Sequence, residues 1–512
     1  MRKRRFIKIL AVLCAVMMLA SCSSSSNTDE TTLPSQAPTQ PSGPSVITPD
    51  FRLGYNKQDS LNPFKTESAA NCAVIKLMFD SLFVCNNSFE AVPLMADEYE
   101  KDDKTITVKL KQGLVFSDGS AVTSRDVAYS FSLAKSSSVY SSRLSGFDYY
   151  TTVVDDHTVK FFVSSDNPYI IACLDFPVIK TDSSASPIGS GRYRYAAEIS
   201  YGKFLLRNPR YTLGENSGFE AIELYDMGTV DTVAYKVQNG DFDFAYDNLS
   251  SGKAPVLSTS HTTVPLNNMV FIGMNSDSEF LKIQAIRNAI SSAFDAKSVT
   301  SSVYGEFAKP STLPFHPDWY AGDKSYSFES KTPLEYMSTI GYNQINSEGL
   351  ITNGYYTISL NLIVNEENEQ KVKLAYEIAN SITASGIKIN VIKYSFKEYI
   401  SALQNKNYDL YLGEIRLTND MNLSELFGGY VYYQTTNDYG IARENASREA
   451  YDKFLAGELS FSEFCDIFKQ SCPFVPVCFR SGVALFTRSL AGTGEMLTGD
   501  IFYTLPEWSI LK

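Results

Sequence analysis

Histidine and positive charge are both scarce in this chain of 512 residues. Only His157, His261 and His316 occur, widely separated, so a histidine-based metal site or proton relay has little to build on. Lysine and arginine number 45 against 57 aspartates and glutamates, which gives a formal net charge of −12. An acidic chain lacks the basic surface of a nucleic-acid-binding protein. We therefore expect no nucleic-acid partner and no cofactor, and an enzyme is the less favoured class.

Long apolar runs are missing as well, apart from one short run near the N-terminus. Residues 9–19 are uncharged and apolar, and these 11 residues are too few for a permanent membrane-spanning helix. Five basic residues precede this run, and Leu19-Ala20-Ser21-Cys22 ends it. The pattern predicts a signal peptide over residues 1–21.

The end of the signal peptide resembles the lipobox of bacterial lipoproteins. In that class the signal peptidase cuts before the cysteine, and the diacylated cysteine becomes the first residue. The resemblance implies lipidation at Cys22, an extracytoplasmic location and membrane contact through the N-terminal lipid. The alternative is an ordinary signal peptide in which Cys22 has no role. Residues 22–49 contain almost no large apolar side chains, so we expect a disordered tether there.

The mature chain is not rich in cysteine. Either Cys72 with Cys85, or two of the last three cysteines, could form a disulfide, because export permits oxidation. Buried free thiols are the other interpretation. A zinc site is disfavoured because the spacing contains no Cys-x-x-Cys and no nearby histidine. Beyond Cys14 and Cys22, the six cysteines are Cys72, Cys85, Cys173, Cys465, Cys472 and Cys478.

Length favours about three domains, and two parts of the chain show regular patterns. In the first part, residues 51–55, 104–110 and 159–163 read as strands, and a capping box at Thr123 and Asp126 opens a helix. This part therefore combines a sheet with a helix.

The second part predicts a parallel α/β sheet. Residues 358–364, 387–391 and 408–412 read as strands separated by two amphipathic helices, the first of which ends at Gly386. Parallel sheets bind ligands beyond the carboxyl ends of their strands. Residues 413–426, which follow the last expected strand, are therefore the predicted location of a site.

Ten short segments carry a resemblance to a known family. The most extensive reads TVKLKQGLVFSDG at 107–119 and continues into TSRDV at 123–127. The others are LNP at 61–63, LMFDSL at 77–82, VPLMA at 92–96, GSGRY at 189–193, LRNPRY at 206–211, VQNGDFD at 237–243, FIGMN at 271–275 and RNAISSAFD at 287–295.

Taken in the order of the chain, the segments resemble those of the extracellular solute-binding proteins of family 5, the oligopeptide-, dipeptide- and nickel-binding receptors of ABC importers. Two departures concern the ligand. Arg192 stands where the family pattern GTGPY has proline, and GEIRLTND at 413–420 stands in place of the tryptophan-rich segment of the peptide binders.

The resemblance implies an α/β fold, a periplasmic-binding-protein-like two-lobed clamp (type II, cluster C) with an extra α+β domain. Lobe I would be discontinuous, over residues 50–70, 188–268 and 475–512. The extra domain would span 71–187, and lobe II would span 269–474. A peptide would bind between the lobes, favour their closure and be delivered to ABC permease subunits in the membrane. We expect a monomer and no enzymatic activity.

The resemblance also suggests ligand-binding residues. In dipeptide- and oligopeptide-binding relatives, an aspartate after the corresponding strand pairs with the α-ammonium of the peptide, which implies this role for Asp420. Asn419 is the alternative, because the alignment leaves a freedom of one residue. An amide lacks the charge for a strong bond to an ammonium, however. We expect Arg416 to pair either with Asp420 or with a ligand carboxylate.

Other ligands and activities compete with peptide import. Within the family, the ligand could be a nickel chelate or a sugar, although scarce histidine disfavours direct nickel ligation. A receptor that senses peptides without importing them fits the sequence equally well. A metal cluster at Asp155-Asp156-His157 is disfavoured, because its place directly before a strand is typical of an exposed turn.

An exported serine hydrolase is the alternative from another class. Ser132 and Lys135 fit the S-x-x-K motif, and residues 165–167 spell the SDN of penicillin-recognising enzymes. The third motif of that class is Lys-Thr-Gly, whereas this chain has Lys-Thr-Pro at 331–333. Proline has no backbone N–H to donate, so the hydrolase interpretation is disfavoured.

Overall fold

The computed structural model describes residues 48–196, 203–228, 230–275, 277–427 and 445–511. The predicted signal peptide, Cys22 and the tether as far as residue 47 lie outside these residues. None of the helices in this described part is both long and apolar enough to cross a membrane.

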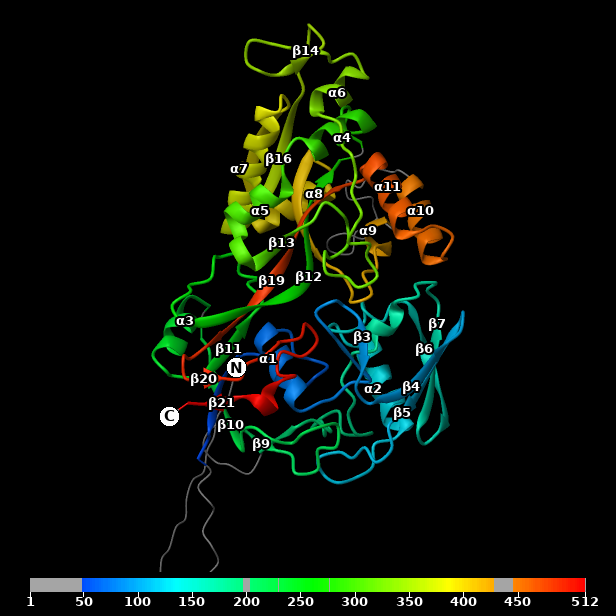
Figure 1. Ribbon diagram of the computed structural model, residues 1–512, viewed down its shortest axis with the longest axis vertical. Coiled ribbons are helices and arrows are strands. Elements are labelled where there is room, and N and C mark those ends of the chain that lie inside the picture. The colour runs from blue at the N-terminus through cyan, green and yellow to red at the C-terminus, as the bar shows by residue number, and fades with distance from the viewer. Residues whose placement is uncertain (1–47, 197–202, 229, 276, 428–444, 512) are drawn as a thin grey trace, which may run out of the picture. The chain divides into compact units, whose positions relative to one another are not determined.

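Eleven of the described strands form one mixed sheet, in the order β17-β16-β18-β12-β19-β11-β1-β10-β9-β8, with β13 paired to β19 (Figure 1). Most of its N-terminal strands are short and most of its C-terminal ones longer. The strands are β1 (Phe51–Tyr55), β8 (Tyr193–Tyr195), β9 (Lys203–Arg207), β10 (Ala221–Asp226), β11 (Phe244–Asp247), β12 (Ser260–Met274), β13 (Ala308–Pro310), β16 (Ser359–Asn365), β17 (Lys388–Tyr394), β18 (Leu410–Arg416) and β19 (Val475–Phe486).

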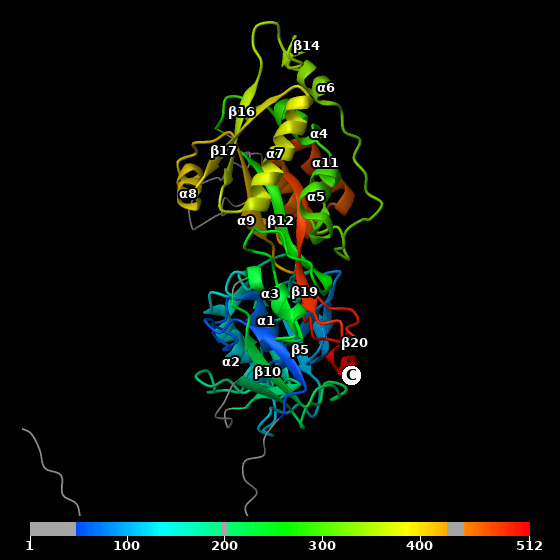
Figure 2. The same cartoon turned by 90° about the vertical axis from the view of Figure 1, so that its left-hand side faces the viewer.

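Two long strands, β12 and β19, run through both lobes of the fold. Residues 260–265 of β12 pair antiparallel with the end of β19, which also pairs with β11 of the first lobe. Residues 268–274 of β12 pair with β18 of the second lobe. Figures 1 and 2 show the two strands side by side where one lobe passes into the other. The β12–β19 register shifts between Pro265 and Met269, which is a bulge in the connection.

The second lobe is built on the parallel strands β16, β17 and β18. Alternating residues of these strands face two separate apolar cores, so helices cover both faces of the sheet. Leu360, Leu362 and Val364 of β16 pack with α7, whereas Ile363 packs with α8. The helices are α4 (Gln284–Ser292), α5 (Ala296–Tyr304), α6 (Pro333–Ser338), α7 (Glu369–Ala384), α8 (Phe396–Gln404), α9 (Ser424–Phe427), α10 (Asn445–Leu455) and α11 (Phe461–Ser471).

The predicted strand–helix–strand–helix–strand unit is confirmed, with one correction. Gly386 follows the last residues of α7 at φ +103°, a conformation that favours glycine. Strand β18, however, runs to Arg416 rather than ending at 412. Glu414, Ile415 and Arg416 continue the strand because they pair with Val270, Met269 and Asn268 of β12, a contact invisible to local periodicity.

The first lobe contains β1 and β8–β11 with helices α1 (Ala69–Val74) and α3 (Val230–Gln238). Beside it lies a small antiparallel sheet, β4-β5-β7-β6, covered by α2 (Ser124–Lys135). We call this sheet and helix the small domain. The expected capping box is present, since the Asp126 carboxylate accepts from the backbone N–H of Thr123 at 2.8 Å. The strands are β4 (Ala96–Lys101), β5 (Thr105–Leu110), β6 (Phe147–Asp155) and β7 (Thr158–Val163).

These elements make the fold the predicted α/β two-lobed clamp with an added small domain. The exact boundaries expected for its domains stay a prediction. Shorter elements complete the described chain: β2 (Phe83–Cys85), β3 (Ala91–Pro93), β14 (Gln344–Ile345), β15 (Ile351–Thr352), β20 (Leu490–Ala491), β21 (Ser509–Ile510) and four 3₁₀ turns at Ile75–Leu77, Ile170–Cys173, Gly305–Phe307 and Leu505–Glu507.

Candidate functional site

The three predicted site residues lie at the end of β18 and in the loop that follows. Arg416 is the last residue of the strand and pairs in register with Asn268 of β12. Asn419 and Asp420 follow in the loop, where both are buried. Arg416 is exposed to solvent. The structure therefore collects the three residues at the carboxyl end of a parallel strand, as the sequence predicts.

Asp420 faces the small domain. Its Oδ2 atom accepts from the Asn167 amide at 2.9 Å, and the Thr418 hydroxyl donates to Oδ1. Burial raises the pKa of the Asp420 carboxyl, and the hydrogen bonds from Thr418 and Cys173 only partly offset this effect. In the part of the chain that the structure describes, no lysine or arginine forms an ion pair with this carboxylate.

Asn419 forms hydrogen bonds both to Asp175 and to Asn267 of β12. Its Nδ2 donates to the Asp175 carboxylate at 3.0 Å, and its Oδ1 accepts from Asn267 at 3.3 Å. Asp175 in turn pairs with Arg143 at 2.8 Å. Asn267 lies in the bulge of β12, so Asn419 ties this bulge to the small-domain side.

Arg416 completes the network through Asn267, whose Oδ1 accepts from Nε at 3.3 Å. Although the side chain is exposed, the protein surrounding its head group lowers the pKa of Arg416, and the like charge of Arg143 lowers it further. Within the described ranges, Arg416 forms no ion pair with a carboxylate. We call this set the Asn267 network: Arg143, Asn167, Asp175, Asn267, Arg416, Asn419 and Asp420.

Four of these residues were not found from the sequence. Asn167, Asp175, Asn267 and Arg143 come from segments remote from the β18 loop. Asn167 belongs to the SDN segment, and its amide binds Asp420 instead of a substrate. No signal in the sequence links the other three to the loop.

A second charged cluster lies on the same strand, two residues before Arg416. The Glu414 carboxylate pairs with Lys371 at 2.8 Å and lies 3.6 Å from Arg480, and it accepts from Asn268 at 2.9 Å. Burial acts to raise the pKa of Glu414, but Lys371 and Arg480 outweigh it and bring the pKa to about 2. Glu414 is therefore held as a carboxylate at neutral pH.

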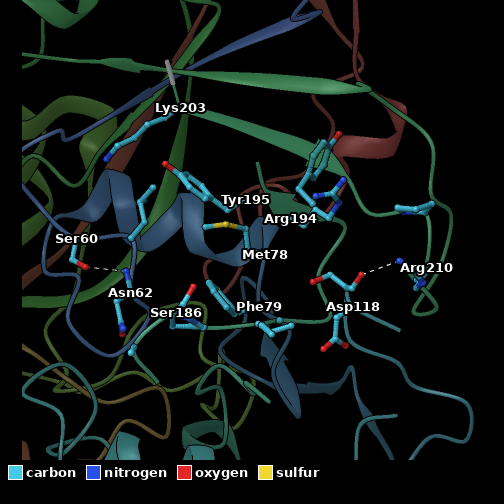
Figure 3. Close-up of a pocket in the computed structure, with 18 residues that line it drawn as sticks. Ser60, Asn62, Met78, Phe79, Asp118, Ser186, Arg194, Tyr195, Lys203 and Arg210 are labelled. Carbon is cyan, nitrogen blue, oxygen red and sulfur yellow. Dashed lines mark hydrogen bonds between the residues drawn. The ribbon is translucent and has the colours of Figure 1, made fainter. Parts of the chain in front are cut away.

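A pocket of about 700 Å³ lies elsewhere, between the β8–β9 hairpin and residues 60–62, 78–79 and 117–118 (Figure 3). Three of its charged residues have protein partners: Lys203 lies over the Tyr55 ring at 4.9 Å, Asp118 pairs with Lys180 at 2.6 Å, and Arg210 donates to the Ser117 carbonyl at 3.1 Å. Figure 3 shows Lys203, Arg194 and Tyr195 on one side of the pocket and Asp118 with Arg210 on another. The pocket contains none of the predicted site residues.

The residues of the hydrolase interpretation are not assembled for catalysis. The Ser132 hydroxyl donates to the Tyr129 carbonyl of its own helix at 2.7 Å. Lys135 donates to the carbonyls of Leu144 and Phe147, at 2.9 and 2.7 Å. Thr332 of the Lys-Thr-Pro segment caps helix α6. Each residue thus has a structural partner of its own.

Metal and disulfide chemistry find little support in the described residues. No group of three histidine, cysteine or acidic side chains is gathered there as a metal site. His157 lies in the turn between β6 and β7. Its backbone N–H donates to the Asp155 carboxylate at 2.8 Å, as expected for a turn. All six cysteines in this part of the chain are free thiols, so neither suggested pairing is formed.

The fold defines a class: a two-lobed α/β protein whose lobes share two long strands. A sequence profile described as bacterial extracellular solute-binding proteins, family 5 (middle region), matches residues 90–436. This chain belongs to that family, and the resemblance stated from its motifs is confirmed.

Curated relatives and solved structures agree with this assignment. The chain is 22% identical over 452 residues to the oligopeptide-binding protein AppA of Bacillus subtilis (strain 168), with 80% of each chain covered. It is 23% identical over 440 residues to the periplasmic murein peptide-binding protein MppA of Escherichia coli (strain K12), with 78% of this chain and 79% of the relative covered.

Solved structures share the fold at lower identity. The unliganded open form of the murein tripeptide-binding protein MppA superposes with a TM-score of 0.71 at 19% identity, covering 92% of this chain and 99% of the other. NikZ from Campylobacter jejuni in complex with Ni(L-His) superposes with a TM-score of 0.63 at 17% identity, covering 90% of this chain and 100% of the other. These likenesses establish the two-lobed fold.

Proposed function

We propose that this protein captures peptides between its lobes and delivers them to an ABC permease in the membrane. Curated relatives named as oligopeptide- and murein peptide-binding proteins support a peptide ligand. The observation that carries the proposal is a basic and an acidic residue at the end of β18 and in the loop that follows it. Arg416 is accessible, and the Asp420 carboxyl has no cationic partner in the described residues.

A basic and an acidic residue four positions apart suit a ligand that carries both an ammonium and a carboxylate. Asp420 is the proposed partner of the peptide ammonium, with Asn419 beside it, and Arg416 is the proposed partner of a carboxylate. A carboxylate offers about four acceptor positions, so Asp420 can accept an ammonium in addition to Asn167 and Thr418. Arg416 retains unused N–H donors, because only Nε binds Asn267 in the described part.

Native mass spectrometry of the protein as purified tests the ligand class. We expect the folded protein to carry short peptides, seen as a set of masses that disappears after unfolding and refolding. A nickel-chelate or sugar adduct in place of peptides would overturn the peptide assignment. Structural similarity to a nickel-complex-bound neighbour makes the chelate the second candidate.

We also propose that Cys22 carries a lipid and anchors the protein on the outer side of the cell membrane. The Leu-Ala-Ser-Cys sequence at 19–22 supports this. Cys22→Ala is expected to leave the precursor unprocessed or release the protein from the membrane fraction, whereas Cys72→Ala, as the matched control, is expected to leave it in place. A processed, membrane-bound Cys22→Ala protein would contradict the proposal.

A further inference from the structure

Two guanidinium groups of the Asn267 network retain hydrogen-bond donors. Arg143 binds Asp175 through Nη1 at 2.8 Å and lies over the Tyr140 ring at 4.7 Å. Arg416 binds Asn267 through Nε. A guanidinium has five N–H donors, so within the residues that the structure describes each group has several donors left for a ligand.

A continuous chain of bonds joins the two arginines. Arg416 binds Asn267 at 3.3 Å, Asn267 binds Asn419 at 3.3 Å, and Asn419 binds the same Asp175 oxygen that pairs with Arg143. The two groups are thus placed by one shared framework, with Arg416 on the β18 side and Arg143 on the small-domain side.

The network holds two arginines and two aspartates, but within the described residues only one of these aspartates, Asp175, pairs with an arginine. Besides the surrounding protein, the strongest influence on Arg416 is repulsion by Arg143. Lys76 adds a third cation, because its ammonium donates to the Asp175 backbone carbonyl at 3.2 Å. Asp175 is already shared between Arg143 and Asn419. A ligand carboxylate at each guanidinium group would supply counter-charge to both arginines.

We infer that the ligand carries two carboxylates, one held by Arg416 and the other by Arg143. This inference rests on the proposed function and narrows it: the preferred solutes are acidic peptides, with an aspartate or glutamate side chain in addition to the C-terminus. Arginine suits this task because its planar fork matches a carboxylate with two parallel hydrogen bonds.

A peptide pool tests the inference. The probe is an equimolar pool of tri- to pentapeptides in which every glutamate peptide has a glutamine counterpart of the same shape. The full chain, purified in detergent, is unfolded to remove bound solutes, refolded and incubated with the pool, and the retained peptides are quantified by mass spectrometry. We expect glutamate members to be retained about tenfold more than their glutamine counterparts, as for a gained charged hydrogen bond.

Variants assign the preference to the two arginines. Arg143→Gln and, at the exposed position, Arg416→Gln are each expected to bring the glutamate-to-glutamine ratio close to one. Arg125→Gln removes the same charge from an exposed position of α2 and is expected to leave the ratio unchanged. Thermal unfolding checks that each variant is folded, and Arg143→Lys, which keeps a cation beside Asp175, replaces Arg143→Gln if the latter does not fold.

The outcomes separate the inference from the proposed function. A ratio of one in the unmodified protein, with peptides retained, overturns the inference and leaves peptide capture standing. A preference for glutamate that both variants keep also overturns it. Retention of no peptide at all overturns the proposed function, and the inference falls with it.

Discussion

Glu414 and Asp420 are carboxylates on the same short segment, yet their surroundings shift their pKa values in opposite directions. Burial by itself raises the pKa of either group. At Glu414, Lys371 and Arg480 outweigh burial, and the pKa falls to about 2. At Asp420, hydroxyl, thiol and amide donors do not outweigh burial, and the pKa stays raised.

The difference in pKa shows that Glu414 belongs to a structural ion-pair cluster, whereas Asp420 lacks a cationic partner in the described residues. Glu414 is already neutralised by protein charges, so a ligand ammonium would gain little there. Asp420 would gain more from an ammonium, because its carboxyl is buried without a cationic partner in the described residues. The comparison therefore supports Asp420, rather than Glu414, as the partner of a ligand.

The largest expected effect comes from removing the charge of Glu414. Glu414→Gln leaves Lys371 and the buried Arg480 without their carboxylate, so we expect a loss of about 3–5 kcal/mol in the free energy of unfolding. Chemical denaturation at pH 7 measures it. Glu348→Gln, at an exposed position, is the control. Equal stability of Glu414→Gln and the unmodified protein would show that the cluster contributes nothing.

The pH dependence of the free energy of unfolding also tests the difference between Glu414 and Asp420. The folded pKa of Glu414, about 2, lies below its ordinary value of 4.5, so its contribution is complete above about pH 5 and is lost as the pH falls towards 2. We expect the stability gap between the unmodified protein and Glu414→Gln to narrow by about 3 kcal/mol over this range.

Asp420 should behave in the opposite way. Its folded pKa is raised, so its ionisation destabilises the fold as the pH rises through that value. Denaturation series at several pH values compare the two variants Glu414→Gln and Asp420→Asn with the unmodified protein. Parallel pH curves for all three proteins would contradict the opposite assignments.

Replacement of Asp420 is expected to affect binding more than stability. Asparagine can still accept from Asn167, so the free energy of unfolding should change by less than about 1 kcal/mol. Affinity for a free-amine peptide should fall by about 2 kcal/mol, as when a charged hydrogen bond is lost. Calorimetry with the peptide and its N-acetylated form checks this, because the acetylated form should bind weakly to both proteins. Undiminished affinity of Asp420→Asn would remove Asp420 from the site.

The smallest expected effect concerns the contact between Asp420 and the small domain. Asn167→Ala deletes the amide donor to a buried carboxylate, so we expect a loss of about 1–2 kcal/mol in the free energy of unfolding. Asp166→Ala, at the exposed neighbouring position, is the control for thermal and chemical denaturation. A loss no greater than that of the control would mean that Asn167 does not support Asp420.

Local sequence patterns predicted the second lobe well because its strands and helices are regular. Alternating apolar residues in β16 and the apolar stripe of α7 follow from burial on the two faces of one sheet. The end of β18 was predicted four residues too early. Its last residues are held by β12, a partner about 150 positions away, and this pairing leaves no local pattern.

The candidate site was predicted only in part for the same physical reason. Arg416, Asn419 and Asp420 are neighbours in sequence. The position after a parallel strand predicted the range 413–426, and the family resemblance suggested these three residues within it. Their partners Asn167 and Asp175 are separated from them by 253 and 244 residues. Folding alone brings these side chains together, so no motif could indicate whether Asp420 meets an amide, a cation or solvent.

The bulge in β12 lies beside Arg416, one of the candidate ligand-binding residues. Asn267 and Asn268 lie where the ladder between β12 and β19 is interrupted, so neither residue pairs with β19. These two side chains bind Arg416 and Glu414, and the Asn267 carbonyl accepts from the Leu417 N–H at 2.9 Å. Bending at the bulge therefore moves the anchor of Arg416. The connection between the lobes and the position of the Arg416 head group therefore depend on the same residue, Asn267.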